Sequence, residues 1–350
     1  MSRRPPRNPG NIVFTAFSAE GLNRLKKAKA RASEQLLKPS MEATAFSAAA
    51  AVTSPSIDKN LVGVGIGEKI KDGKHTGTMA VKFLVRIKYP DDQIPDNQRL
   101  PTMYDGMPVD VEQVGTFRRL SAPAPAMPNP RRKMRPAPPG SSVGFKDPAG
   151  AMVMAGTFGA VAKKGAAQFV LSNNHVLADE NRLPLASPIF QPGLLDDGNP
   201  STDEIAKLTK LVKLHASGMN KVDCAIAQVL DNSLVTKSIL GIGAPSGVAS
   251  AAIDMVVHKF GRTTNYTVGR VTSISTDVKV GYEIGTLLFQ DQIIVVGLSG
   301  HPFSASGDSG SLILERASQK AVGLLFAGSS SHTIANHIED VLSSLGVTLA

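Results

Sequence analysis

The chain has 350 residues, of which 42% are hydrophobic and 5% aromatic. This length allows two domains, or one large domain with appendages, and the apolar content supplies a packed core, which excludes a wholly disordered chain. The formal net charge of +9 at pH 7 would indicate an anionic partner if it were spread over the fold. It is instead concentrated, because residues 1–40 carry nine Lys or Arg against two acids and residues 131–135 carry four more. The basic character therefore belongs to a tail and a linker, for which a solvated segment and weak polyanion binding are the two open interpretations.

The sequence predicts a cytoplasmic protein without a membrane span. The opening MSRRPPRNPGN is followed by FTAFSAEGLNRLKK, which is too polar for the apolar core of a secretory signal. No apolar run reaches the length that crosses a bilayer. The single cysteine, Cys224, excludes an intrachain disulfide framework and fits a reducing compartment.

Residues 1–55 are predicted to form a basic tail that contains one amphipathic helix. Between residues 18 and 37, apolar side chains recur at helical spacing with Arg and Lys between them. These side chains are Leu22, Leu25, Ala28, Ala32 and Leu36. Such a helix either packs on the body of the protein or lies on a partner, and the sequence leaves both open.

Residues 56–120 are predicted to form a small α/β module. Three β-rich segments, 61–67, 78–88 and 107–115, are separated by turn-forming residues. The glycines of the first segment form G-x-G-x-G followed by EKIKDGK, not the glycine pattern that opens a helix in a dinucleotide-binding loop. We therefore interpret these glycines as strand and turn residues.

A proline-rich linker is predicted to separate this module from a larger β region. Residues 121–142, SAPAPAMPNPRRKMRPAPPGSS, hold too much proline for a helix or a sheet interior, which predicts an extended, semi-rigid segment. Over residues 143–350, short apolar segments alternate with Gly, Pro, Asp and Asn. This alternation of short apolar segments and turn residues favours a pair of β-barrels or a β-sandwich over a parallel sheet.

Three short stretches carry side chains suited to acyl-transfer chemistry. His175 interrupts an apolar run in LSNNHVLADE, Asp223 opens the apolar segment of NKVDCAIAQVL, and Ser309 lies among glycines in SASGDSGSLIL. Each alone has a structural explanation: a satisfied core histidine, a strand-capping acid and a Gly/Ser loop. Together they complement one another, because a buried carboxylate needs a partner and an imidazole needs a group that holds its tautomer. The other ring nitrogen is then left to take a proton from Ser309.

These stretches resemble the motifs of chymotrypsin-like (trypsin-like) serine peptidases. SNNHVLA resembles the histidine motif, VDCAIAQV the D-I-A-L strand and SGDSGSLIL the G-D-S-G-G-P motif. The order His, Asp, Ser, with gaps of 48 and 86 residues, suits a peptidase of two six-stranded β-barrels with the site in the cleft between them. The match covers residues 140–350, where KFGRTTNYTVGRV also resembles a second-barrel segment of bacterial members. More narrowly, VGVGIGEK, the proline-rich linker and RPAPPGSSVG resemble bacterial relatives of the plant NARROW LEAF 1 type.

The resemblance implies a role for each of these residues. Ser309 is then the nucleophile, His175 the general base and later general acid, and Asp223 the carboxylate that orients the imidazole. The N–H groups of Gly307 and Ser309 would form the oxyanion hole. One departure is Ser311, which stands where the family motif has a glycine.

The resemblance also implies substrate-binding residues. Phe303 stands six residues before the nucleophile, where trypsin-type enzymes hold an acid, so an apolar or small substrate side chain is expected. Leu325 stands where glutamate-cleaving relatives carry a histidine, which argues against cleavage next to glutamate. The segment Phe326, Ala327 and Gly328 is expected to pair through its main chain with an extended peptide.

The expected function is that of a cytoplasmic serine endopeptidase that acts on proteins or peptides through an acyl-enzyme intermediate. The open alternative is a catalytically latent pseudopeptidase, or a peptide-binding scaffold, that uses the same cleft. The six histidines besides His175, together with Cys224, lack metal-ligand spacing, so neither a metal nor an organic cofactor is expected. A homo-oligomer and weak polyanion binding by the basic tail stay open.

Overall fold

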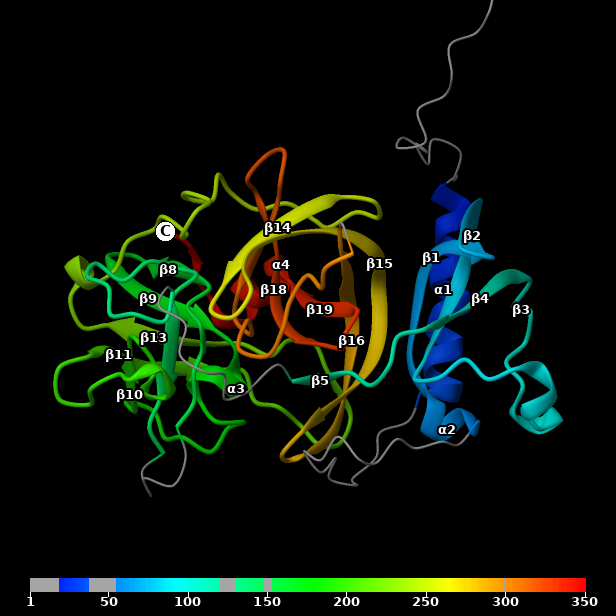
Figure 1. Ribbon diagram of the computed structural model, residues 1–350, viewed down its shortest axis with the longest axis horizontal. Coiled ribbons are helices and arrows are strands. Elements are labelled where there is room, and N and C mark those ends of the chain that lie inside the picture. The colour runs from blue at the N-terminus through cyan, green and yellow to red at the C-terminus, as the bar shows by residue number, and fades with distance from the viewer. Residues whose placement is uncertain (1–18, 38–54, 120–129, 148–152, 299) are drawn as a thin grey trace, which may run out of the picture.

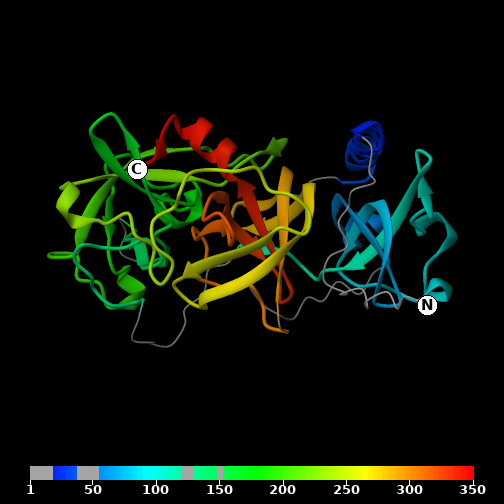
Figure 2. The ribbon, with the colours of Figure 1, turned by 90° about the horizontal axis from the view of Figure 1, so that it is seen from above.

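The protein is mainly β and contains three bodies in a row (Figures 1 and 2). Figure 1, a computed structural model of residues 1–350, shows a green barrel on the left, a yellow-to-red barrel in the centre and a blue-to-cyan α/β part on the right. The structure describes residues 19–37, 55–119, 130–147, 153–298 and 300–350. The prediction of two barrel-like sheets preceded by an α/β part is confirmed.

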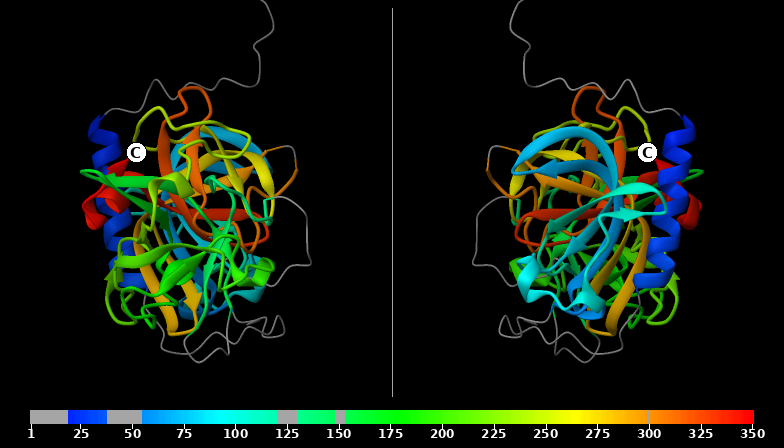
Figure 3. Two further views of the ribbon diagram at one scale, coloured as in Figure 1. Left: turned by 90° about the vertical axis from the view of Figure 1, so that its left-hand side faces the viewer. Right: turned by 90° about the vertical axis from the view of Figure 1, so that its right-hand side faces the viewer.

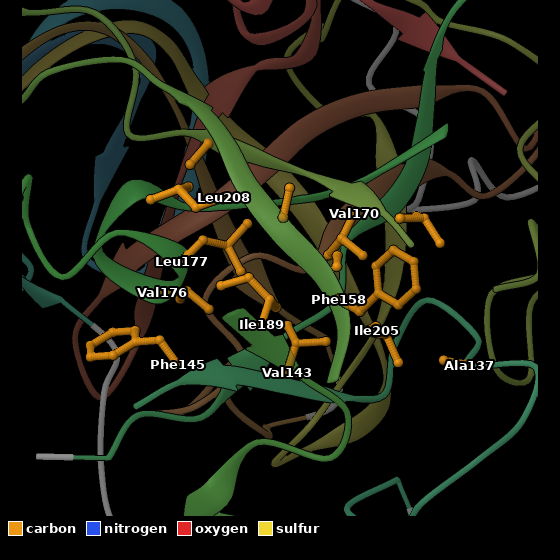
Figure 4. Packing of buried hydrophobic residues seen from close by; sticks show 14 of the residues in the cluster. Ala137, Val143, Phe145, Phe158, Val170, Val176, Leu177, Ile189, Ile205 and Leu208 are labelled. Carbon is orange, nitrogen blue, oxygen red and sulfur yellow. The ribbon is translucent and has the colours of Figure 1, made fainter. Parts of the chain in front are cut away.

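The first barrel is an eight-stranded sheet in the order β20-β8-β9-β13-β11-β10-β6-β7. Its strands are β6 (Ser142–Phe145), β7 (Gly156–Thr157), β8 (Ala160–Lys164), β9 (Ala167–Ser172), β10 (Pro188–Phe190), β11 (Glu204–Leu211), β13 (Ala225–Val229) and β20 (Thr348–Leu349). Figure 4 shows how apolar side chains such as Val143, Val170 and Ile205 fill its interior. The short helix α3 (Asn174–Leu177) follows β9 and buries Val176 and Leu177 in the same core, which fixes the residues next to them.

The second barrel belongs to a twelve-stranded sheet, in which β14 to β19 form a ring closed by the pairing of β15 with β16. Its strands are β14 (Val256–Gly261), β15 (Asn265–Tyr282), β16 (Gly285–Gly297), β17 (Leu312–Glu315), β18 (Ala321–Gly328) and β19 (His332–His337), and β12 (Met219–Asn220) adds to β16 in parallel. The C-terminal helix α4 (Ile338–Leu345) joins a core cluster that contains residues from both barrels, among them Leu171 and Leu324. The two barrels therefore share buried apolar surface.

The N-terminal α/β part continues the sheet of the second barrel. It comprises α1 (Ala19–Leu36), α2 (Ile57–Asn60), β1 (Leu61–Lys71), β2 (Lys74–Val85), β3 (Met103–Tyr104) and β4 (Met107–Gln113), with 3-10 turns at Asp91–Gln93 and Asp96–Gln98. Strand β1 pairs antiparallel with β15, with Gly63 opposite Val278. A Cβ on Gly65 would lie 2.6 Å from Ser273 Oγ, so the glycine of the strand permits the close approach. The prediction that these glycines are strand residues is confirmed.

The predicted amphipathic helix is confirmed as α1, and it packs on the body of the protein. Figure 3 shows α1 on one side of the β1–β2 sheet. Leu25, Ala28 and Ala32 are buried in one cluster with Phe83 of β2. Lys29 Nζ also lies 2.5 Å from a carboxylate oxygen of Asp277 in β15. Of the two options that the sequence left open, the structure shows packing on the body.

The described end of the predicted linker packs against the first barrel. Arg131 is 5% exposed, and its Nε lies 3.9 Å from Asp196 in the turn Leu194–Asp196. Lys133 Nζ lies 2.5 Å from Asp203. The basic residues between 131 and 135 thus include side chains paired with carboxylates of the barrel, because burial of a cation requires a counter-charge.

Several sequence predictions concern residues that the structure leaves undescribed. The basic tail lies partly in residues 1–18 and 38–54, and the first part of the proline-rich stretch, residues 121–129, also lies outside the described residues. Within the described ranges, no helix has both the length and the apolar character needed to cross a membrane.

Candidate active site

His175 and Asp223 form a buried hydrogen-bonded pair. His175 lies in α3 directly after β9, and Asp223 stands two residues before β13, the strand that pairs with β9. The distance from His175 Nδ1 to Asp223 Oδ2 is 2.5 Å, and both side chains are 0% exposed. An ionised carboxylate can only accept, so Nδ1 carries the proton and Nε2 presents its lone pair. Nε2 accepts no hydrogen bond from any residue that the structure describes.

Further hydrogen bonds fix the Asp223 carboxylate. Its Oδ1 accepts from Asn174 N at 2.7 Å and from His175 N at 3.3 Å, and its Oδ2 accepts from Tyr282 Oη at 2.7 Å. These hydrogen bonds offset the cost of burying the charge, and they fix the orientation of the Asp223 carboxylate. The first turn of α3 therefore carries the His175 imidazole, and its backbone N–H groups also hold the Asp223 carboxylate that accepts from this imidazole.

Sequence reasoning missed Tyr282. This residue ends β15 in the second barrel, 59 residues after Asp223, and no motif of the sequence marks it. Its ring meets the His175 ring edge-on at 6.0 Å and stacks on Phe289 at 5.8 Å. Phe289 in turn contacts Phe326 at 4.7 Å. An aromatic wall thus supports the His175–Asp223 pair from the second barrel.

The loop of Ser309 lies beside this pair. Thr157 N donates a hydrogen bond of 2.8 Å to the Ser309 carbonyl oxygen. A Cβ placed on Gly156 would lie 2.6 Å from Val176 and 3.0 Å from that same oxygen. The lack of a side chain at Gly156 therefore lets α3 and the Ser309 loop approach one another. These contacts place the Ser309 loop next to α3, the short helix that carries His175.

Two glycines allow the backbone shape of this loop. Gly307 and Gly310 have φ of +94° and +93°, a conformation that L side chains rarely adopt. A Cβ on Gly310 would also lie 2.0 Å from Ser172 Oγ. The Gly307 N–H makes no hydrogen bond within the described part of the chain, so it is available to an incoming acceptor.

Asp308 anchors the loop from within. Its carboxylate accepts hydrogen bonds from Thr263 N at 2.8 Å, Thr264 N at 3.1 Å, Thr264 Oγ1 at 2.6 Å and Ala305 N at 3.0 Å. Lys259 Nζ lies 3.3 Å away, and both charged side chains are fully buried. Burial lowers the pKa of Lys259, and the charge of Asp308 opposes that shift only in part. No sequence pattern marks this ion pair, apart from the position of Lys259 at the start of KFGRTT.

Ser311, the departure from the family motif, fits the loop. Its Oγ donates a hydrogen bond of 2.6 Å to the Asp308 carbonyl oxygen. A Cβ on Gly261 would lie 2.7 Å from that Oγ, so Gly261 makes room for the serine. The hydroxyl closes the turn and is satisfied inside it.

Two of the predicted substrate-binding side chains lie in barrel cores. Phe303 is 1% exposed and packs with Val257, Val271 and Val295 of the second barrel. Phe326 is fully buried in the aromatic wall. Substrate contact by these two residues stays a prediction.

Ala327 and Gly328, the other predicted substrate-binding residues, are paired within the chain. The short strand β5 (Arg118–Arg119) lies antiparallel to β18, with Arg119 opposite Ala327 and Arg118 opposite Gly328. The main chain that was expected to receive a peptide thus already faces another strand of the same protein.

Comparison with known proteins supports a peptidase. The model of peptidase family S64 matches residues 207–332, a little over a third of the chain, including Asp223 and Ser309. No curated protein matches the chain. Similar solved structures include Thermobifida fusca protease A, with 17% identity and a TM-score of 0.43 over 61% of this chain and 97% of that one. A glutamic acid-specific serine protease has 20% identity and a TM-score of 0.43 over 61% of this chain and all of its own. Nocardiopsis protease has 16% identity and a TM-score of 0.41 over 59% and 95%.

These similarities are low, so the role of each residue depends on the geometry of this chain. The arrangement combines a buried imidazole–carboxylate pair, a nearby serine and a loop with an available amide donor. Such a set of groups is able to activate a hydroxyl and to stabilise an oxyanion.

Proposed function

We propose that this protein is a serine endopeptidase that hydrolyses peptide bonds through Ser309, His175 and Asp223. The observation that carries the proposal is the buried pair of His175 and Asp223, 2.5 Å from Nδ1 to Oδ2, beside the glycine-flanked loop of Ser309. The peptidase family match over residues 207–332 supports the same class of reaction.

In the proposed reaction, Ser309 Oγ attacks the carbonyl carbon of the substrate and its proton passes to His175 Nε2. The carboxylate of Asp223 stabilises the imidazolium that forms. Collapse of the tetrahedral intermediate breaks the peptide bond, and His175 gives its proton to the leaving amine. Water then attacks the acyl-enzyme by the same route and releases the carboxylic acid product and the free serine.

The N–H groups of Gly307 and Ser309 are the proposed oxyanion hole. Each such donor contributes on the order of 3 kcal/mol to the transition state in enzymes of this kind. The Gly307 N–H makes no hydrogen bond to any described residue, and Asp308 anchors the loop. Both observations support this assignment, because a preorganised donor needs a loop that does not rearrange.

For the substrate, we propose an extended peptide with an apolar or small side chain next to the cleaved bond. At Phe303, six residues before Ser309, the chain has no acid for a basic side chain. Nearby, the hydroxyls of Ser304 and Thr333 bond to one another at 2.6 Å. Main-chain pairing with Ala327 and Gly328 would hold the peptide as an added strand.

The test is covalent labelling with a fluorophosphonate probe. The native protein is expected to be labelled, while Ser309→Ala and His175→Ala are expected to stay unlabelled, because the first lacks the nucleophile and the second lacks the base. Ser306→Ala in the same loop is the matched control and is expected to keep its labelling. Labelling of Ser309→Ala at the native rate would overturn the assignment of the nucleophile.

The second candidate is a pseudopeptidase or peptide-binding scaffold that uses the same cleft. The pairing of β5 with Ala327 and Gly328 favours it, because the peptide-binding edge is occupied. A folded native protein that resists the fluorophosphonate yet binds peptides would establish this alternative.

The remaining sequence predictions stay proposals. They are the NARROW LEAF 1 type, the cytoplasmic location, a homo-oligomer and polyanion binding by the tail. The division into residues 1–55, 56–120, 121–142 and 143–350 belongs with them.

A further inference from the structure

Three segments of the chain lie one after another along one edge of β18: β17, the Ser309 loop and β5. At its beginning, Leu324 faces Leu312 of β17. Further along, Leu325 exchanges hydrogen bonds with the Ser309 loop, because Gly310 N donates to its carbonyl at 2.8 Å and its own N–H donates to Ser311 O at 3.0 Å. Beyond Leu325, the strand β5 pairs with the same edge at Ala327 and Gly328. The opposite edge of β18 is covered throughout by β19, from Gly323 to Gly328.

The direction of β5 matters as much as its place. Since β5 runs antiparallel to β18, the chain passes Gly328 at Arg118 and Ala327 at Arg119, and so advances toward the end of β18 that contacts the Ser309 loop. A peptide that adds to this edge and presents its carbonyl to Ser309 needs the same main-chain positions.

Strand β5 is also held from its other side. Arg118 stands opposite Gly281 of β15 in a parallel bridge, and Gly281 N donates to Phe117 O at 3.4 Å. Phe117 itself is 1% exposed and packs in the cluster that contains Tyr282 and Phe326. The anchor of β5 therefore lies in the aromatic wall behind the candidate active site.

The N-terminal α/β part keeps β5 near this edge. Its strand β1 pairs with β15, and Glu112 Oε1 of β4 lies 2.7 Å from His332 Nε2 of β19. Only Val114, Gly115 and Thr116 separate this ion-paired strand from Phe117. A tethered strand binds with a high effective concentration, so even a two-residue strand competes with a free peptide.

We propose that β5 is a built-in inhibitory strand that occupies the substrate edge of β18 and must leave before an extended peptide binds. The proposal rests on the proposed peptidase function. It assigns to the N-terminal α/β part the role of an inhibitor in the same chain. Extended peptides, which form more main-chain hydrogen bonds than the two residues of β5, displace it in competition.

The test compares two reagents of different length on the full chain. One is a small fluorophosphonate, which does not need the β18 edge; the other is a tetrapeptide phosphonate with leucine next to phosphorus, which does. In Arg119→Pro, whose proline removes an N–H from β5, the labelling rate of the tetrapeptide reagent is expected to rise about tenfold, while that of the small reagent changes by less than about threefold. Thr116→Pro, outside β5, is the matched control and is expected to behave as the native protein.

The outcomes separate the two proposals. If the small reagent labels native protein and Arg119→Pro alike and the tetrapeptide reagent gains nothing, the inhibitory strand is refuted while the peptidase stands. An equal gain for both reagents also refutes it, because that result indicates general loosening of the fold. If neither reagent labels either protein, the peptidase proposal fails, and the inference that rests on it falls as well.

A disulfide lock provides a second test should Arg119→Pro fail to fold. Arg119 and Ala327 stand directly opposite one another, so the double variant Arg119→Cys, Ala327→Cys places two thiols across the pair. Cys224 is fully buried and remains outside this exchange. Oxidation is expected to lower the rate with the tetrapeptide reagent about tenfold, and reduction to restore it. An unchanged rate in the oxidised protein would refute the inhibitory role.

Discussion

Tyr282 Oη donates a hydrogen bond of 2.7 Å to Asp223 Oδ2, and thereby joins the end of β15 in the second barrel to a carboxylate of the first. The same carboxylate oxygen lies 2.5 Å from His175 Nδ1. The orientation of the proposed base is thus set by both barrels, and the tyrosine acts through Asp223 as a positioning residue.

Replacing Tyr282 with phenylalanine removes this hydrogen bond and keeps the ring stacked on Phe289. We expect kcat to fall about tenfold with KM unchanged, because a hydrogen bond to a charged group is lost where the imidazolium forms. Tyr266→Phe, whose hydroxyl contacts His258 at 3.2 Å, is the matched control. A loss that appears in KM while kcat is unchanged would contradict the positioning role and limit the tyrosine to packing.

Replacing Asp223 with asparagine tests the orienting carboxylate. The amide keeps the size of the side chain but presents a donor or a neutral acceptor to His175, so the imidazole takes the wrong tautomer. We expect kcat to fall by roughly 10³–10⁴ while the protein stays folded. Steady-state kinetics on a peptide substrate measures the loss, and Asp340→Asn, at a half-exposed site paired with Lys221, is the control. A fall of only a few-fold would contradict the proposed triad.

Lys259 should give the enzyme an alkaline limit. Burial lowers the pKa of Lys259 below the ordinary lysine value of 10.5, so its ammonium is lost at a lower pH than that of an exposed lysine, and Asp308 then loses its cation. Activity is therefore expected to fall as pH rises through this lowered pKa. The same titration favours the folded state as pH rises, because the unfolded chain binds more protons in that range.

Two substitutions of Lys259 separate charge from packing. Lys259→Arg keeps a charge that does not titrate there, so the alkaline loss of kcat/KM should move to higher pH. Lys259→Met leaves Asp308 buried without a counter-ion and should destabilise the fold by about 3–5 kcal/mol. Urea unfolding and a pH–rate profile measure the two effects. An identical alkaline limit in the native protein and in Lys259→Arg would show that another group sets it.

Glu112 should make the fold sensitive to acid. Burial alone would raise its pKa, but the hydrogen bond from His332 and the charge of Lys82 lower it from 4.5 to about 2. A carboxyl whose folded pKa is lowered contributes stability above its unfolded pKa and loses it as pH falls through the folded value. Between about pH 4.5 and pH 2, this group should therefore lose on the order of 3 kcal/mol of stabilisation. Urea unfolding across that range should show a smaller slope in Glu112→Gln, whereas the exposed control Asp92→Asn should keep the native slope. Equal slopes in all three proteins would refute the assignment.

Local patterns predicted much of this protein correctly. The helix of residues 19–36 follows from apolar spacing, and the glycines at 63, 65 and 67 follow from a strand that approaches its neighbour closely. The order of His175, Asp223 and Ser309 pointed to one site because each residue lies in a short stretch with its own recognisable chemistry. The triad itself stays a prediction until the labelling is done.

Other features depend on partners far apart in the chain. The hydroxyl of Tyr282 and the ammonium of Lys259 reach Asp223 and Asp308 only after the β strands have paired. The union of β1 with β15 likewise depends on register between segments that lie about two hundred residues apart.

By itself, the sequence determined the elements, the mainly β class and the candidate triad, since hydrophobic periodicity, turn residues and catalytic motifs are local. Only the tertiary structure decided what holds Asp223, what anchors the Ser309 loop and which strand occupies the edge at Ala327 and Gly328. These contacts arise from strand pairing and burial between distant segments, whose free energy is distributed over the whole fold and leaves no signature in any single stretch.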